Sequence, residues 1–228
     1  MVKRYFLSYS NLKINVTYVI NKKFNKMLDN KSIRAEARNR LSGNWGQPIG
    51  VFSIYLIITI VLQNIPFIGP IALIFIAGPL TLGFAIYFLK FLKNEESNLN
   101  QLFEGFKNYG NALVTYLLYS IYILLWTLLF IIPGIIAQMK YSQVWFIMAE
   151  DSEISGNDAL KKSKEMMDGF KMQYFLLALS FIGWILLAML TCGIGLLWVV
   201  PYIQTSYAKF YEALKEHQAQ NPSLIEEN

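Results

Sequence analysis

Three long stretches of apolar residues alternate with short charged segments along the chain. Charged residues are absent from 41–89, from 108–139 and from 172–208. As one helix, the first stretch would be about 74 Å long at ~1.5 Å per residue, whereas the hydrocarbon core of a bilayer is only ~30 Å thick. The other two stretches are also too long for one crossing. The pattern therefore predicts that each stretch crosses a membrane twice.

Each apolar stretch contains a turn signal near its middle, made of proline or glycine. The signals are Pro66–Pro70, Pro133–Gly134 and Gly193–Gly195, and these residue types end helices and favour turns. The sequence therefore predicts an all-α fold, a polytopic membrane helix bundle of about six transmembrane helices arranged as three helical hairpins. The predicted spans are 48–64, 68–92, 111–131, 133–149, 173–191 and 194–213.

A similar polar segment precedes each predicted hairpin. The segments 32–43, 97–110 and 155–169 each begin with serine and end with glycine, which suit the N-cap and the C′ position of a helix. We therefore expect a cytoplasmic amphipathic helix before each hairpin.

The recurrence of this unit suggests an internal repeat. The proposed repeats are 31–92, 97–149 and 155–213, within a single integral membrane domain of residues 28–213. The alternative is that three unrelated hairpins look alike because they obey the same charge rule. Residues 214–228 are expected to form a polar cytoplasmic tail.

Composition excludes several other classes of protein. The 228 residues are 55% hydrophobic and only 15% charged, whereas soluble domains carry roughly 25% charged residues. So many apolar side chains cannot all be buried in one soluble core of this size. An ordinary soluble enzyme domain, a disordered tail and a nucleic-acid-binding module are therefore excluded.

The basic residues indicate an orientation in the membrane. The formal net charge is +5, yet the three predicted hairpin turns contain no Lys or Arg. Apart from Lys140, all basic residues lie in the segments on the opposite side, and such segments face the cytoplasm. We therefore expect a multi-pass protein of the cell membrane with both termini in the cytoplasm. Its basic amphipathic helices favour anionic lipid at the cytoplasmic face of the bilayer.

The sequence offers little for catalysis or for metal binding. It has one cysteine, Cys192, and one histidine, His217, which are too few for a zinc site or a hydrolase triad. The acidic run Glu150, Asp151 and Glu153 follows the fourth span. We interpret it as a solvated loop, with weak binding of a divalent cation as the alternative. We expect no enzyme activity and no cofactor.

Lys140 is the sharpest candidate for a contact with a ligand or a lipid. It follows Pro133 by seven residues, which puts it ~10 Å into the membrane from the outer turn. A lysine near mid-membrane costs ~2.5–3.5 kcal/mol, so it usually faces a cavity or a partner. The alternatives are snorkelling to the interface or a misplaced boundary of the fourth span. Gln143 is expected to share a helix face with Lys140, whereas Gln138 is not, and both are further candidates for a ligand or lipid contact.

Other polar and aromatic residues at membrane depth have two interpretations. Amides there either contact a ligand or form hydrogen bonds between helices. Aromatic side chains either form a binding box or anchor and pack the helices. The amides are Gln63, Asn64, Gln138, Gln143 and Gln204. The aromatic residues are Tyr87, Tyr141, Tyr202, Tyr207 and Tyr211, with Trp45, Trp126, Trp145, Trp184 and Trp198.

Several motifs resemble those of the bacterial integral membrane proteins grouped as domain-of-unknown-function family 975. The resemblance covers about residues 28–213. Its motifs are Ala35–Arg38, Asn44–Gly46, Ile132–Ile135, Ala159–Ser163, Phe181–Leu186, Gly193–Gly195, Trp198, Pro201–Tyr202 and Tyr207–Tyr211. The resemblance implies a multi-span membrane protein, typical of Gram-positive bacteria, with no established activity and no functional residues to carry over. Members usually begin near Met27, so residues 1–27 are interpreted as an N-terminal extension that a misassigned start would explain.

Two functions from different classes follow from these observations. The first is a non-enzymatic membrane protein that binds partners or organises the envelope, in contact with the lipid bilayer and not with nucleic acid. The protein partner stays unknown. The alternative is a small carrier or lipid-handling protein that uses the intramembrane residue Lys140.

Overall fold

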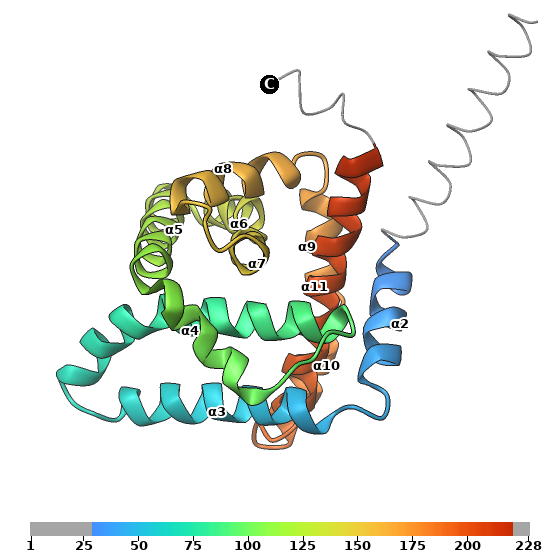
Figure 1. The fold of residues 1–228 in the computed structure, drawn as a ribbon, viewed down its shortest axis with the longest axis horizontal. Helices are drawn as coiled ribbons and strands as arrows, with labels where there is room; N and C mark the ends of the chain where they lie inside the picture. The colour runs from blue at the N-terminus through green and yellow to red at the C-terminus, as the bar shows by residue number, and fades with distance from the viewer. Residues whose placement is uncertain (1–28, 221–228) are drawn as a thin grey trace, which may run out of the picture.

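Every regular element of the computed structural model is helical within residues 29–220, which are the residues that the structure describes (Figure 1). The predicted extension, residues 1–27, and the last part of the predicted tail, residues 221–228, lie outside this range. The elements are α2 (Asn30–Leu41), α3 (Gly46–Gln63), α4 (Ile68–Leu92), the 3-10 helix η1 (Leu99–Asn108), α5 (Tyr109–Leu129), α6 (Ile131–Lys140), α7 (Val144–Glu150), α8 (Gly156–Met166), α9 (Lys171–Leu179), α10 (Ile182–Leu190) and α11 (Leu196–Gln220). The predicted all-α class is confirmed.

Four helical stretches are long and apolar enough to cross a membrane. They are Gly46–Gln63, Ile68–Leu92, Leu99–Leu129 and Lys171–Leu190. The first two match predicted spans closely, and the third combines η1 with α5. These four stretches support a membrane protein.

Two predicted spans are interrupted. The span at 133–149 is divided into α6 and α7 by residues 141–143, and the span at 173–191 is divided into α9 and α10 by residues 180–181. The stretch Lys171–Leu190 is still long and apolar enough to cross a membrane, whereas α6 and α7 have only 10 and 7 residues. The last helix, α11, is instead longer than expected and continues through Gln220.

The predicted turns connect helices that pack side by side. In Figure 1, α3 lies along α4, and α5 lies along α6. The turns use backbone conformations that most residues avoid, with φ of +62° at Phe67, +53° at Cys192 and +84° at Gly193. A glycine at the last position avoids the steric cost of the left-handed region.

The three polar segments form helices that pack against the bundle. Ser155 caps α8 as predicted, because its hydroxyl accepts a hydrogen bond from the Asp158 N–H, at 3.2 Å. Ser32, however, lies inside α2, and η1 is capped by Asn98. Ile33, Ala37 and Leu41 of α2 are fully buried, and the same is true of Leu102 on η1 and Ala159 on α8.

Close approach of η1 to the middle of α4 depends on two glycines. A Cβ atom on Gly83 would lie 1.8 Å from the Leu102 carbonyl oxygen, and one on Gly105 would lie 2.0 Å from the Pro79 carbonyl oxygen. No larger residue fits either position without moving the backbone. Small residues of this kind allow the backbones of membrane helices to touch.

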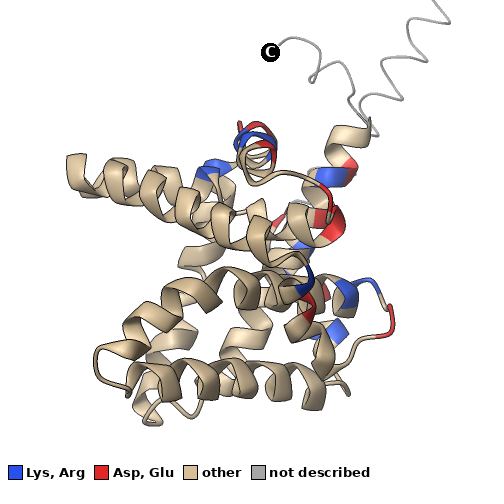
Figure 2. Cartoon of the chain, turned by 60° about the vertical axis from the view of Figure 1, so that its left-hand side comes forward, with Lys and Arg blue, Asp and Glu red and all other residues tan. Residues whose placement is uncertain are grey.

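Charged residues gather on one side of the molecule (Figure 2). They lie on α2, η1 and α8, at the ends of α4, α6 and α7 and on the second half of α11, whereas the turns at 64–68 and 130–131 and at 191–195 carry none. The exposed surface near these turns is largely apolar, as in Leu128, Ile132 and Leu190, which are 81%, 71% and 82% exposed. An apolar exposed surface of this kind suits contact with lipid.

Candidate functional site

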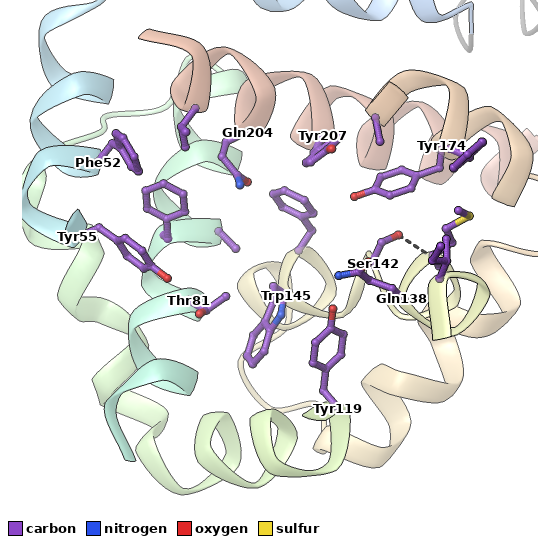
Figure 3. A pocket seen from close by; sticks show the side chains of 18 residues that line it. Phe52, Tyr55, Thr81, Tyr119, Gln138, Ser142, Trp145, Tyr174, Gln204 and Tyr207 are labelled. Atoms are coloured by element: carbon purple, nitrogen blue, oxygen red, sulfur yellow. Dashed lines mark hydrogen bonds between the residues drawn. The ribbon is translucent and has the colours of Figure 1, made fainter. Parts of the chain in front are cut away.

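A cavity of about 580 Å³ lies between the helices. Its walls come from α3, α4, α5, α6, α7, α9 and α11 (Figure 3). None of the described residues that line it carries a charged, histidine or cysteine side chain. Nine of them carry uncharged polar atoms: Tyr55, Thr81, Tyr119, Gln138, Ser142, Trp145, Tyr174, Gln204 and Tyr207.

The break between α6 and α7 shapes one side of this cavity. The Ser163 hydroxyl from α8 donates a hydrogen bond to the Lys140 carbonyl, at 2.9 Å, and accepts one from the Gln143 N–H, at 3.2 Å. The Ser142 hydroxyl donates to the Met139 carbonyl, at 2.9 Å. These bonds occupy backbone groups that a continuous helix would satisfy itself. The break is therefore stabilised, and Ser142 and Trp145 face the cavity from it.

Aromatic rings in the walls fix one another in place. Tyr55 packs on Phe84 with ring centroids 4.9 Å apart, and Tyr174 packs on Tyr207 at 5.0 Å. Tyr119 meets Trp145 edge to face at 6.1 Å. Such geometries are favourable for aromatic pairs. The cavity walls are consequently preorganised.

The polar groups of the cavity fall into two sets. Tyr55 interacts with Thr81, and Tyr174 interacts with Ser142 and Tyr207. By contrast, four groups make no hydrogen bond to any protein atom in the described part of the chain. They are the Gln138 amide, the Gln204 amide, the Trp145 indole N–H and the Tyr119 hydroxyl. Gln138 is exposed, and Tyr119, Trp145 and Gln204 are half-buried, so these four groups are accessible to a molecule that enters the cavity.

The structure separates the three candidate residues identified from the sequence. Gln138 lines the cavity. Gln143 is fully buried at the α6–α7 break, where its amide nitrogen donates to the Ser142 hydroxyl at 2.8 Å and its amide oxygen has no hydrogen-bond partner. Lys140 does not line the cavity.

Lys140 instead packs on the outside of the second hairpin. Its ammonium nitrogen lies 5.8 Å from the centre of the Trp126 ring, within the range of a cation–π contact. Within residues 29–220, no carboxylate lies within ion-pair distance of Lys140. The helix break that follows it ends α6 here, so Lys140 and Gln143 do not share a helix face.

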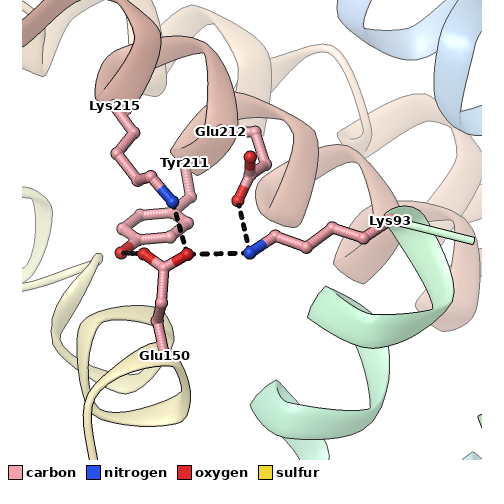
Figure 4. A network of polar contacts seen from close by, with 5 residues as sticks. All are labelled: Lys93, Glu150, Tyr211, Glu212 and Lys215. Carbon is pink, nitrogen blue, oxygen red and sulfur yellow. Dashed lines mark hydrogen bonds and ion pairs between the residues drawn. The ribbon is translucent and has the colours of Figure 1, made fainter. Parts of the chain in front are cut away.

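An ion network lies one helical turn from the cavity, on the charged side of the molecule (Figure 4). Lys93, which follows α4, lies 2.7 Å from a Glu150 carboxylate oxygen and 3.3 Å from Glu212. The Tyr211 hydroxyl donates to the other Glu150 oxygen at 2.8 Å, and Lys215 also donates to Glu150. The network thus joins the ends of α4 and α7 to α11.

Glu150 is the centre of this network, not part of a solvated loop as the sequence suggested. Burial by itself would raise the pKa of Glu150. Hydrogen bonds from Lys215, Lys93 and Tyr211 outweigh that effect and lower the pKa to about 2. Glu150 is therefore ionised at neutral pH. The structure assembles no group of three His, Cys, Asp or Glu side chains suited to a metal ion among residues 29–220.

Sequence reasoning missed the network and part of the cavity. One available signal was that Lys93, Glu150 and Glu212 each lie near the end of the second predicted span of a hairpin. Gln204 was identified among the amides at membrane depth, and Trp145 and Tyr207 among the aromatic residues. Tyr55, Tyr119 and Tyr174 had no distinguishing signal, because tyrosines at membrane depth are common.

The fold defines the class as an all-helical protein with stretches long and apolar enough to span a membrane. A family model described as "Protein of unknown function (DUF975)" matches residues 27–137 and 128–218. The chain therefore belongs to this family, as the motifs in the sequence implied. Comparison with curated proteins and with solved structures finds no match.

Proposed function

We propose that this chain is a non-enzymatic membrane protein that binds a small molecule in the cavity between its three hairpins. The observation that carries the proposal is the set of four polar groups with no protein partner, held in a cavity of about 580 Å³. Cavities of ~300–1,000 Å³ with a few convergent polar groups are typical of small-molecule sites. The absence of acids, bases and thiols from the described walls supports binding and not chemistry.

The membrane arrangement that goes with this function has six spans, as three hairpins, with both termini in the cytoplasm. The uncharged turns and the charged side in Figure 2 support it, because basic segments favour the cytoplasmic side. In this arrangement α6–α7 and α11 complete the six spans, and the ion network lies at the cytoplasmic interface.

Cys192 provides the test of this topology. It is the single cysteine of the chain and is exposed at the turn before α11. A membrane-impermeant maleimide should label it in intact cells, whereas Cys192→Ser with Ser152→Cys should be labelled only after lysis. The reverse pattern would overturn the orientation.

The binding function is tested by extraction into nanodiscs and mass spectrometry of what is retained. Wild type should retain a small molecule that Ala178→Trp loses, because Ala178 lines the cavity and an indole would fill it. Leu190→Trp is the control, since Leu190 is 82% exposed on the outside. Equal retention by both variants would contradict binding in the cavity.

Lys140 supports a second function, contact with an anionic lipid. Its ammonium lies against Trp126 and makes no direct ion pair in residues 29–220. The pKa of Asp168 is lowered mainly by a hydrogen bond from Lys171, and the charge of Lys140 contributes to that lowering. A lipid phosphate would supply a direct partner. Lys140→Ala should lose bound anionic lipid in native mass spectrometry, whereas Lys140→Arg should keep it. Unchanged lipid in Lys140→Ala would leave Lys140 as a packing residue.

A further inference from the structure

We infer that the cavity takes a neutral small molecule with an apolar ring body and hydroxyl or amide groups that both donate and accept hydrogen bonds. This inference rests on the proposed binding function and assigns the class of ligand. It follows from the lack of charged side chains in the described walls, from the four polar groups without a protein partner and from the aromatic rings.

The charge of the ligand follows from the walls. All residues that line the cavity in the described part of the chain are uncharged. An ion moved from water into such a site would lose its hydration without gaining an opposite charge. Nearby charged side chains do not compensate. Glu150 is already paired with Lys93 and Lys215, and the Lys140 ammonium lies against Trp126, which does not line the cavity. A neutral ligand avoids this loss.

The hydrogen-bonding pattern of the ligand follows from the four groups without a partner. The Gln138 and Gln204 amides each offer an N–H donor and a carbonyl acceptor, the Tyr119 hydroxyl offers both, and the Trp145 indole offers a donor only. These groups come from α6, α11, α5 and α7 and face one cavity (Figure 3). Hydroxyl or amide groups complement such a mixed set, whereas a hydrocarbon would leave all four groups unsatisfied.

The shape of the ligand body follows from the aromatic rings. Phe52, Phe84, Phe146 and Trp145 present ring surfaces to the cavity, together with Tyr119, Tyr174 and Tyr207. Packing of Tyr174 on Tyr207 and of Tyr119 on Trp145 holds these rings before a ligand arrives. Fixed aromatic surfaces favour flat or ring-shaped molecules and reduce the entropy lost on binding.

A matched series of probes tests the inference in protein-loaded nanodiscs. The probes are naphthalene carboxamide, naphthoate and naphthylmethylammonium, which share one ring system and carry no charge, a negative charge and a positive charge. Binding is measured by equilibrium dialysis against nanodiscs without protein. We expect the carboxamide to bind at least about tenfold more tightly than either ion.

Four variants connect the result to the cavity. Gln138→Leu and Gln204→Leu should each weaken carboxamide binding by about fivefold, the loss expected for one hydrogen bond. Gln63→Leu is the control, because Gln63 lies at the exposed end of α3. Gln204→Glu should reverse the preference towards naphthylmethylammonium. Thermal unfolding of every variant confirms that it is folded.

The outcomes separate the ligand class from the binding function. If an ion binds best to wild type, and Ala178→Trp abolishes that binding, the ligand class is wrong and the binding function stands. If no probe binds and wild type retains no small molecule that Ala178→Trp loses, both proposals fail. Carboxamide binding that is equal in wild type and Gln204→Leu would also overturn the assignment of the polar groups.

Discussion

The cavity and the ion network lie next to each other but differ in whether their polar groups have partners within the protein. Phe146 and Tyr207 line the cavity, and one turn further along the same helices Glu150 and Tyr211 belong to the network. Phe146 and Tyr211 stack on each other at 5.7 Å, so the two regions are in direct contact. In the network, charged groups are paired with one another. In the cavity, four uncharged groups, on Tyr119, Gln138, Trp145 and Gln204, make no hydrogen bond to the described part of the chain.

This difference separates a structural role from a binding role. Removing one member of a paired set leaves the others unsatisfied and destabilises the fold. Removing a group that has no partner costs the fold little, because nothing depends on it. Mutations in the ion network should therefore mainly lower stability, and mutations of the four cavity groups should mainly weaken ligand binding. Four predictions test this difference, in order of decreasing expected effect.

Gly83→Ala should have the largest effect on stability, because it disrupts the packing of η1 on α4, the helix that contributes to both the cavity and the ion network. The added Cβ would overlap the Leu102 carbonyl oxygen at 1.8 Å, and overpacking against backbone should cost about 3 kcal/mol. Thermal unfolding in detergent measures the loss. Gly183→Ala is the control, because a Cβ there meets nothing within 4 Å. Equal melting temperatures for the two variants would show that η1 does not pack tightly on α4.

Glu150→Gln should have a moderate effect on stability and little effect on binding. It removes the carboxylate that Lys93 and Lys215 share. Because Glu150 is still 29% exposed, we expect a loss of only about 1 kcal/mol, which corresponds to ~2–4 °C in Tm. Carboxamide affinity should stay within about twofold of wild type. A tenfold loss of binding would mean that the network and the cavity form one functional unit.

Lowering the pH should remove the stabilisation that the ionised Glu150 carboxylate provides in the wild-type protein. The pKa of Glu150 is lowered from 4.5 to about 2 in the folded protein, so its contribution to stability is complete above pH 4.5. It is lost as the pH falls from about 4.5 to about 2. The difference in Tm between wild type and Glu150→Gln should therefore shrink over that interval. A difference that stays constant down to pH 3 would contradict the network as the source of the stabilisation.

Gln204→Leu should have the smallest effect on stability. The Gln204 amide has no hydrogen-bond partner in residues 29–220, so an apolar side chain of similar size should leave the free energy of unfolding within ~0.5 kcal/mol of wild type. Chemical or thermal unfolding without ligand measures this. Loss of a hydrogen bond that the fold needs would lower the free energy of unfolding by about 2 kcal/mol. A loss of that size would indicate that Gln204 has a structural role.

The sequence predicts the helices of this fold better than their interruptions. The bounds of α4 are the same as those of the predicted span at 68–92, because turn residues and Lys93 mark its ends in the sequence. The breaks at 141–143 and 180–181 contain no proline or glycine. The first is stabilised by Ser163, which comes from another helix. Tertiary contacts of this kind leave no local signal.

The candidate site was only partly predictable for a related reason. A helix that is apolar on all sides has no preferred face in its sequence pattern, so the inward direction of Tyr55, Tyr119 and Tyr174 could not be read from spacing. Lys140 was conspicuous because a charge in a span is rare. Its position beside Trp126, outside the cavity, depends on the direction of the side chain at the end of α6.

The hydrogen bonds of Ser163 have a consequence for the order in which the protein is assembled during synthesis. The Lys140 carbonyl and the Gln143 N–H leave the ribosome before Ser163, which follows Lys140 by 23 residues. Until α8 has been translated, the second hairpin lacks the hydroxyl that occupies its break. Helices α6 and α7 therefore reach their final arrangement only when α8 has emerged, so their maturation is tied to the progress of translation.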